Sequence, residues 1–355
     1  MAIVTIYVDP DASGSNNGTS WANAYTSIGT AVAARDGNLV TSGDTHLYLL
    51  SASSGSEDLC TALVTFESYI TNATNKVIVS ACQAHNGVWN NTIYRVRNTS
   101  TGPAFTMRDQ NVDIIGVQIH KDGSGTYARG IQNLAITTDT IQNDVYEGNL
   151  IKGSNADPSS GIYMQNYSTS GDSYCIIRNN IIYNFTVAGI YIDDDTSVAP
   201  IYIHNNTVYN ITGGTGRGMY TSDPRAEWKN NVCFGSGAYD YYGTTFSSSS
   251  AYNAGGLTGS SRIPYGSNPL YLTTYNASQI FVSPSTFDLH ALSGGPLSNA
   301  GQDLATGNTR FTFTTDIDGQ TRVSPWSIGA DDPNVSEAPP SVYIIPEFAR
   351  IFLCT

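Results

Sequence analysis

The hydrophobic and polar positions of residues 114–234 repeat along the chain. The same short pattern occurs five times: an apolar residue, a polar or small residue, glycine or asparagine, and then apolar residues again. The glycine or asparagine of this pattern lies at positions 116, 148, 179, 205 and 230. These positions are 32, 31, 26 and 25 residues apart. A second series, Gly130, Gly161, Gly189 and Gly218, lies between them at spacings of 31, 28 and 29 residues. Two interleaved series with one shared period predict stacked structural repeats.

Each repeat is predicted to contain two short strands separated by a corner. The corner asparagines Asn179, Asn205 and Asn230 fall in register. Asparagine tolerates the left-handed backbone that a corner needs, and stacked asparagine side chains can form hydrogen bonds along the axis of the stack. Successive coils would then rise by about 4.8 Å, as neighbouring strands do in any sheet. The predicted structural ladder consists of Asn179, Asn205, Asn230, Gly161, Gly189 and Gly218.

The first 50 residues differ from these repeats. Residues 3–8 alternate like a strand, and Trp21, Tyr25, Ile28 and Val32 follow a helical spacing that predicts a helix over 21–34. A Gly-Asp-Thr turn at 43–45 then leads into an apolar strand at 46–50. The first coil of a solenoid exposes an apolar cross-section and unpaired backbone groups. Residues 1–50 are therefore predicted to cap that end.

This order of elements resembles the N-terminal cap of right-handed parallel β-helix proteins of the pectate-lyase-like superfold. Residues 295–301, 316–322 and 326–331 resemble the C-terminal cap of the same group, often described as choice-of-anchor or β-helix repeat proteins. The resemblance implies an all-β, single-stranded right-handed parallel β-helix. It implies a helix-bearing cap at 1–50, coils at 51–262 and a C-terminal cap at 263–332. It says little about function, which depends on sites added to a fold.

Residues 333–355 depart from this pattern. Pro339 and Pro340 make a stiff break, and residues 342–353 are the most apolar segment of the chain. Two interpretations stay open. The tail could lie back on the solenoid as a last strand, or residues 340–355 could be an assembly segment that docks on other virion or surface proteins or builds a homotrimer.

Five cysteines show no metal-ligand spacing. Cys175 and Cys233 fall at inward positions of the repeat and are expected in the core. A disulfide between Cys60 and Cys82 is left open. The histidines lie on separate elements, so no metal site is expected.

The charge of the chain restricts its partners. The formal net charge is −13, and only 13% of the residues are charged. This balance argues against nucleic acid, whose phosphates need Lys and Arg, and against an anionic membrane surface. The start of the chain shows no signal-peptide pattern, and no apolar run reaches the length of a membrane span. A location on a virion surface or outside the cell is expected.

One acidic corner offers weak candidates for catalysis. Asp193, Asp194 and Asp195 follow one predicted strand, and Asp223 and Arg225 hold the corresponding place on the next coil, with Arg217 at the start of that strand. Two of these carboxylates could serve glycoside hydrolysis. Alternatively, they could hold Ca²⁺ on a uronate, with an arginine as the base of a lyase reaction. The third interpretation is a solvated acidic turn, because consecutive aspartates on a strand face opposite ways.

Tyr163, Tyr191 and Tyr220 lie in register on successive coils and are expected to point outward. Such a row could cover and stiffen the sheet. It could also bind the apolar faces of sugar rings, which makes the three tyrosines candidates for glycan binding.

Together these patterns favour a structural or binding protein on the surface of a particle. The favoured case is a bacteriophage virion component, such as a head decoration, fibre or tailspike-like protein, that binds a cell-surface polysaccharide. One alternative is a polysaccharide lyase or glycoside hydrolase of the pectate-lyase-like fold. Another is an extracellular adhesin. Enzymatic activity is left open, with a non-enzymatic role favoured, and no cofactor is implied except Ca²⁺ under the lyase interpretation.

Overall fold

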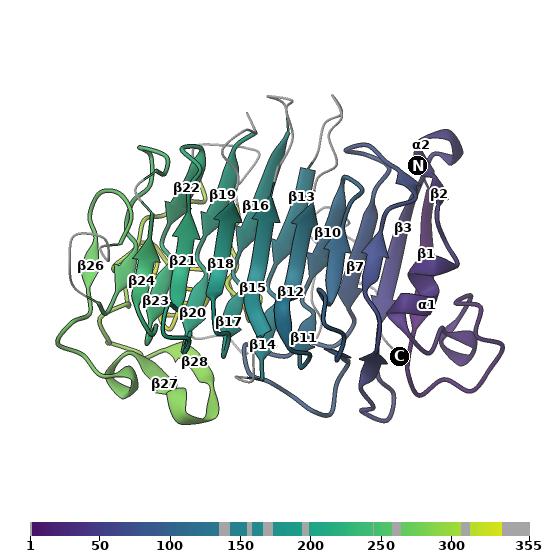
Figure 1. Ribbon diagram of the computed structural model, residues 1–355, viewed down its shortest axis with the longest axis horizontal. Helices are drawn as coiled ribbons and strands as arrows, with labels where there is room; N and C mark the ends of the chain where they lie inside the picture. Colours follow the sequence, from purple (N-terminus) through teal and green to yellow (C-terminus); the bar gives the residue numbers. More distant parts are fainter. Residues whose placement is uncertain are drawn as a thin grey trace.

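The computed structural model describes residues 2–134, 143–154, 158–165, 173–193, 199–243, 245–257, 264–306 and 313–335. Within these residues, three long sheets of parallel strands form the walls of a solenoid (Figure 1). From β7 to β24, consecutive strands of the chain belong to the three long sheets in turn, so each sheet gains one strand per coil. The predicted parallel β-helix is therefore confirmed. Asp194, Asp195 and the proposed assembly segment at 340–355 lie outside the described residues.

Each sheet runs along the whole stack of coils. The eight-stranded sheet contains, in spatial order, β1 (Ala2–Val8), β3 (Asp44–Leu50), β7 (Val77–Ala81), β10 (Val112–Ile115), β13 (Asn143–Glu147), β16 (Tyr174–Arg178), β19 (Ile201–His204) and β22 (Ala226–Lys229). The nine-stranded sheet contains β4 (Asp58–Cys60), β8 (Arg95–Asn98), β11 (Gln118–Lys121), β14 (Leu150–Gly153), β17 (Ile181–Tyr183), β20 (Thr207–Tyr209), β23 (Val232–Phe234), β25 (Ala254–Gly255) and β26 (Leu270–Tyr271). The seven-stranded sheet contains β5 (Val64–Phe66), β9 (Phe105–Met107), β12 (Gly125–Leu134), β15 (Pro158–Gln165), β18 (Ala188–Asp193), β21 (Arg217–Thr221) and β24 (Tyr239–Tyr242).

The remaining elements are short. They are the helices α1 (Ile28–Ala33) and α2 (Leu39–Ser42), the 3-10 turns η1 (Trp21–Asn23), η2 (Ala277–Gln279) and η3 (Pro284–Thr286), the parallel pair β2 (Gly37–Asn38) and β6 (Tyr69–Ile70), and the antiparallel pair β27 (Phe281–Ser283) and β28 (Asp288–Ala291). None of the helices among the described residues is long and apolar enough to cross a membrane.

The single helix predicted over 21–34 is wrong in its extent. It is divided into η1 and α1, because Tyr25 between them binds the backbone of β1 on both sides. The Tyr25 amide donates to Tyr7 O, and the Asp9 amide donates to Tyr25 O. The Ser27 side chain then accepts a hydrogen bond from the Gly29 amide and starts α1. The apolar face of α1, Ile28, Ala31 and Val32, joins the main core.

The corner asparagines have the predicted left-handed backbone. Asn179, Asn205 and Asn230 have φ angles of 53°, 52° and 54°. The amide ladder, however, belongs mainly to the next residue of each coil. Asn180 Nδ2 donates to Asn206 Oδ1 over 3.0 Å, and Asn206 Nδ2 donates to Asn231 Oδ1 over 3.0 Å. The full ladder comprises Asn149, Asn180, Asn206, Asn231 and Asn253, and all five are fully buried.

The glycine series meets a different requirement. A Cβ at Gly189 would lie 2.4 Å from Val208 Cγ1 and 2.7 Å from Gly218 O. A Cβ at Gly161 or Gly218 would likewise overlap a side chain of the facing sheet and a carbonyl of the next coil. Glycine is therefore needed at these positions because two sheets and the next coil meet there at close range.

Within residues 272–306 and 313–335, several side chains and backbone groups contact the outside of the nine-stranded sheet. The Asn205 and Asn230 side chains donate to Gly329 O and Gln302 O over 3.1 and 2.7 Å. Tyr183 of β17 stacks on Phe287 with ring centroids 4.7 Å apart. A second apolar core forms between the sheet and this segment. These described residues thus form a lateral cover bound by the corner asparagines, while a cap at 263–332 stays a prediction.

The thiols Cys60, Cys175 and Cys233 are free and buried. Cys175 and Cys233 belong to the main core, as predicted. A disulfide between Cys60 and Cys82 does not form, since Cys60 is a free thiol; its nearest polar partners are Asp58 and Ser27.

Replacing Asn206 by alanine is expected to lower the free energy of unfolding by about 3 kcal/mol, because it leaves several buried ladder groups without partners. Thermal or urea unfolding followed by circular dichroism measures this loss. Asn86→Gly is the control, since Asn86 is exposed and also has a positive φ of 48°. Equal stability of the Asn206→Ala variant and the parent would show that the ladder does not stabilise the fold.

Gly189→Ala is expected to destabilise the fold by about 2 kcal/mol, because the added methyl overlaps Val208 and the next coil. Gly214→Ala is the matched control, because a Cβ there meets nothing within 4 Å. The two melting temperatures, measured side by side, give the comparison. Similar melting temperatures would show that the coils can separate enough to admit a methyl group.

Candidate functional site

The outer face of the seven-stranded sheet carries a row of stacked tyrosines. Tyr163, Tyr191, Tyr220 and Tyr242 are paired in register on β15, β18, β21 and β24, and we call them the tyrosine column. Their successive ring centroids are 5.0, 4.3 and 5.1 Å apart. Side chains alternate along a strand, and the residue before each of these tyrosines belongs to the main core, as Ile190 does before Tyr191, so each tyrosine ring lies outside the solenoid. Tyr242 was not among the sequence candidates because residues 235–262 do not follow the repeat.

Two arginines lie across this column. The guanidinium carbon of Arg129 is 3.3 Å from the centroid of Tyr163. That of Arg217 is 4.7 Å from Tyr220 and 4.1 Å from Tyr242. Such cation–π contacts hold an arginine in place without neutralising its charge. Among the described residues, neither guanidinium lies within ion-pair distance of a carboxylate, and both Nε atoms are buried without a hydrogen-bond partner.

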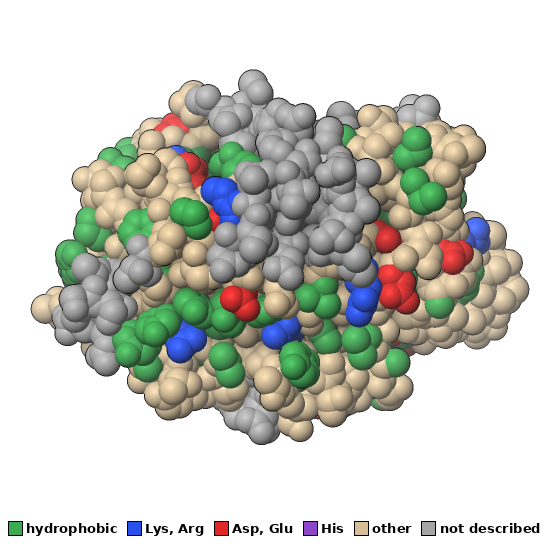
Figure 2. Space-filling view, turned by 45° about the horizontal axis from the view of Figure 1, so that its top comes forward, with side chains coloured by type: hydrophobic (Ala, Val, Ile, Leu, Met, Phe, Trp, Pro, Cys, Tyr) green, Lys and Arg blue, Asp and Glu red, His purple; other side chains and the backbone are tan. Residues whose placement is uncertain are grey.

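The three sequence candidates in the column are not equally accessible. Tyr163 is only 4% exposed, because Arg129 covers its ring and its hydroxyl donates to Asp193 Oδ2 over 2.8 Å. Tyr191 and Tyr220 are half-buried and present part of their rings to solvent. The accessible part of the surface therefore consists of Tyr191, Tyr220 and the flanking arginines. Figure 2 shows hydrophobic side chains gathered in a band along the molecule, interrupted by basic and acidic ones.

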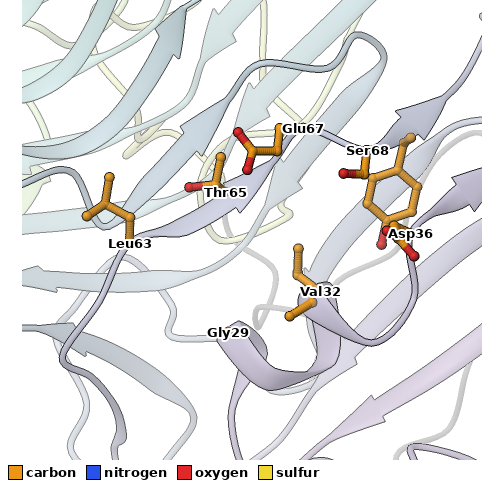
Figure 3. Close-up of a pocket in the computed structure, with 9 residues that line it drawn as sticks. Gly29, Val32, Asp36, Leu63, Thr65, Glu67 and Ser68 are labelled. Atoms are coloured by element: carbon orange, nitrogen blue, oxygen red, sulfur yellow. The ribbon is translucent and has the colours of Figure 1, made fainter.

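The same sheet carries a pocket at its other end. The outward position of the tyrosine column continues through Gln132 and Thr106 to Thr65 of β5, which lines a cavity of about 310 Å³. Figure 3 shows Val32 of α1 facing Leu63 and Thr65, with Asp36, Glu67 and Ser68 at the rim. Glu67 is paired with Arg108 at 3.6 Å. This end of the face is therefore acidic, whereas the tyrosine column is flanked by arginines.

Of the predicted acidic corner, the structure describes Asp193, Asp223, Arg217 and Arg225. Asp223 is fully buried, and its carboxylate accepts hydrogen bonds from the Arg225 amide and Nε at 2.7 and 2.8 Å. Asp193 is bound by Tyr163. Arg217 begins β21, whereas Asp223 follows its end, so about 20 Å of extended chain separates them. The described candidates thus form separate structural contacts, and Asp194 and Asp195 lie outside the described residues.

His290, Asp318 and Asp331 form a cluster that sequence spacing did not indicate. Their potential ligand atoms lie within 4.8 Å of one another. Both ring nitrogens of His290 already face carboxylates, with Nδ1 2.6 Å from Asp288 Oδ1 and Nε2 3.2 Å from Asp318 Oδ2. Burial disfavours the charged imidazole, but these hydrogen bonds outweigh it and raise the pKa of His290 to about 11. A metal would have to displace that proton.

The cluster ties the lateral C-terminal segment to an early coil. A Cβ on Gly87 would lie 2.4 Å from His290 Nε2, and neighbouring His85 makes a 2.8 Å hydrogen bond to Gly148 O. Burial raises the pKa of Asp331 to about 6. These contacts hold residues far apart in the sequence together, so we assign the cluster to the stability of the fold.

No family model matches the sequence, and no curated protein matches it. Among solved structures, the chain is similar to the pectate lyase Pel9A. That likeness covers 94% of this chain and 97% of that chain, at 15% sequence identity and a TM-score of 0.44. The parallel β-helix rests on the sheet topology given above, and the function of this chain has to be argued from its own surface.

His290 gives the fold a defined dependence on pH. Its pKa is about 11 when folded and near the ordinary 6.5 when unfolded, so its ion pairs stabilise fully below about pH 6.5 and are lost as the pH rises towards 11. The difference in unfolding free energy between the parent and His290→Gln should therefore shrink from pH 6.5 to 10.5, as measured by urea titration.

His120→Gln is the control for this titration. Burial lowers the pKa of His120 to about 4, so this group is neutral in the folded protein over the whole range. Above about pH 7.5 the unfolded group is neutral as well, and the corresponding difference should stay constant. A His290→Gln difference that stays equally constant would contradict a charged His290.

Proposed function

We propose that this protein is a glycan-binding structural protein, and that its ligand lies along the tyrosine column. The observation that supports this best is the in-register stack of Tyr191 and Tyr220, with ring centroids 4.3 Å apart, on a flat sheet face. Sugar rings bind aromatic faces through their apolar C–H surfaces. Strands repeat at about 4.8 Å along the solenoid, a step close to the length of one sugar unit in a chain. A glycan aligned with the axis would meet one ring per coil.

The charge of the site favours an acidic glycan. Arg129 is 8% exposed and Arg217 is half-buried, and among the described residues neither has a carboxylate partner. A buried cation without a counter-ion is costly, and a carboxylate on a ligand would relieve that cost with a charge-assisted hydrogen bond. Arg129 and Arg217 lie on strands three steps apart, or about 14 Å. A polymer with regularly placed uronate or sialate groups could meet both.

The charges at the two ends of the seven-stranded sheet favour an acidic ligand on the tyrosine column and away from the pocket. Asp36 at the rim of the cavity would repel an acidic chain, and Glu67 is already paired with Arg108, whereas Arg129 and Arg217 attract such a chain. The ligand is therefore assigned to the surface over β12, β15, β18, β21 and β24. The net charge of −13 for the whole chain opposes binding of an acidic polymer away from these arginines and opposes non-specific attachment to nucleic acid.

We propose the surface of a particle as the setting, with a bacteriophage virion component such as a decoration, fibre or tailspike-like protein as the favoured case. Support comes from the architecture: every inner strand of the coils is paired on both edges, and a buried amide ladder runs along the axis. Such a fold suits long exposure outside a cell. It also holds a flat binding face rigid, which reduces the entropy lost when an extended glycan binds.

Tyr191→Ala and Arg217→Ala are each expected to weaken binding of an acidic oligosaccharide at least about tenfold, the first through lost stacking and the second through lost charge pairing. Calorimetry with oligogalacturonate, hyaluronan and polysialic acid measures this. Tyr275→Ala is the matched control, because Tyr275 is an exposed tyrosine outside the column. Unchanged affinity of both column variants for every probe that the parent binds would exclude this surface.

The same probes separate binding from catalysis. Chromatography of each oligosaccharide after prolonged incubation should show it intact, and Asp193→Asn should leave the binding curves unchanged unless Tyr163 moves. Release of shorter products by the parent, lost in Asp193→Asn, would instead favour the lyase or hydrolase alternative.

A further inference from the structure

The outer face of the eight-stranded sheet carries apolar side chains that are shielded from solvent. The main core contains Tyr48, Val79 and Ile114, so the alternating neighbours Leu47, Ile78 and Ile115 face outward. Yet Leu47 and Ile78 are 1% exposed and Ile115 is 4% exposed. Among the described residues, their cluster contains only these three side chains, with Ile3 packed against it. A single layer of four apolar side chains on a sheet cannot bury itself, so a further segment must cover it.

Cys82 lies on this same face. Val77, Val79 and Ala81 of β7 belong to the main core, and Ile78 faces outward, so Cys82 continues the outward series. Cys82 is disulfide-bonded and 2% exposed. The sequence contains five cysteines, of which Cys60, Cys175 and Cys233 are free thiols. The remaining cysteine is Cys354, next to the end of the apolar segment 342–353.

The end of the lateral segment lies within reach of this face. The Arg322 Nη2 atom donates to Asn179 Oδ1 over 2.9 Å, and Phe313 lies 4.9 Å from the guanidinium of Arg178, both at the end of β16. From β16 to β7 the sheet has three strand steps, or about 14 Å. Residues 336–354 can extend over as much as about 60 Å. The chain is therefore long enough to cross the sheet and reach Cys82.

We propose that residues 342–354 dock on the outer face of the eight-stranded sheet of their own chain and are fastened there by a disulfide between Cys354 and Cys82. The apolar side chains of the segment would cover Leu47, Ile78 and Ile115. Forming the bond removes one proton and one electron from each thiol, which pass to a disulfide donor such as oxidised glutathione. The bond closes a loop of more than 270 residues, and disulfides that close long loops restrict the unfolded chain most.

Of the two interpretations of the tail, this proposal favours the one in which the tail lies back on its own solenoid. A segment bound to its own solenoid is not free to assemble with another protein, so assembly through 340–355 would require reduction or displacement first. It also indicates that the protein matures where thiols are oxidised, which fits an exposed particle surface better than a reducing cytosol.

Peptide mapping of the intact protein tests the bond. Trypsin digestion without reductant should give one species in which residues 77–95 are linked to residues 351–355, and dithiothreitol should separate it into two peptides. Non-reducing electrophoresis should show a monomer. Unlinked peptides would overturn the proposal, and a covalent dimer would mean that a second copy provides the partner.

A second measurement tests the docking itself, in a Cys354→Ser background where the bond cannot form. Native trypsin cleavage after Arg350 should be slow in this background and at least about tenfold faster when Ile78→Ser is added. Val282→Ser is the control, because Val282 is 53% exposed on β27. Circular dichroism checks that each variant is folded. Equally fast cleavage with and without Ile78→Ser would show that the tail does not use this face.

Discussion

The buried amide ladder is the interaction on which the rest of the structure depends. Each ladder asparagine binds the backbone amide and the side chain of its neighbour in the adjacent coil, so it fixes the distance between coils and their register at once. Unpaired amides inside an apolar core are costly, and any slip of one coil would break several of these bonds together. Register along the axis follows from this one constraint.

The tyrosine column and the corner asparagines follow the same register. Because every coil is held in step, Tyr163, Tyr191, Tyr220 and Tyr242 stack without any interaction designed for that purpose. The corner asparagines, each one residue before a ladder asparagine, turn outward and bind the backbone of the lateral segment at Thr315, Gly329 and Gln302. One pair of adjacent asparagines therefore serves both the inside and the outside of the solenoid.

Periodicity predicted the coils, the left-handed corners and the tyrosine register, because these depend on residues within one repeat. It did not tell which asparagine of each pair turns inward, since that depends on the direction of the corner. The burial of Asp223 against Arg225 and the covering of Tyr163 by Arg129 depend on contacts between coils. The lateral course of residues 272–306 and 313–335 depends on contacts with residues more than 70 positions away, which no local pattern records.

The central functional claim is that a row of tyrosines, flanked by arginines that have no carboxylate partner among the described residues, binds an acidic glycan. Binding of the unmodified protein to oligogalacturonate, hyaluronan and polysialic acid, each compared with its methyl-esterified form, tests this most directly. At least one acidic form should bind, its ester should bind at least about tenfold more weakly, and added salt should reduce the difference. Equal binding of the acidic and esterified forms, or no binding of any of them, would contradict this claim.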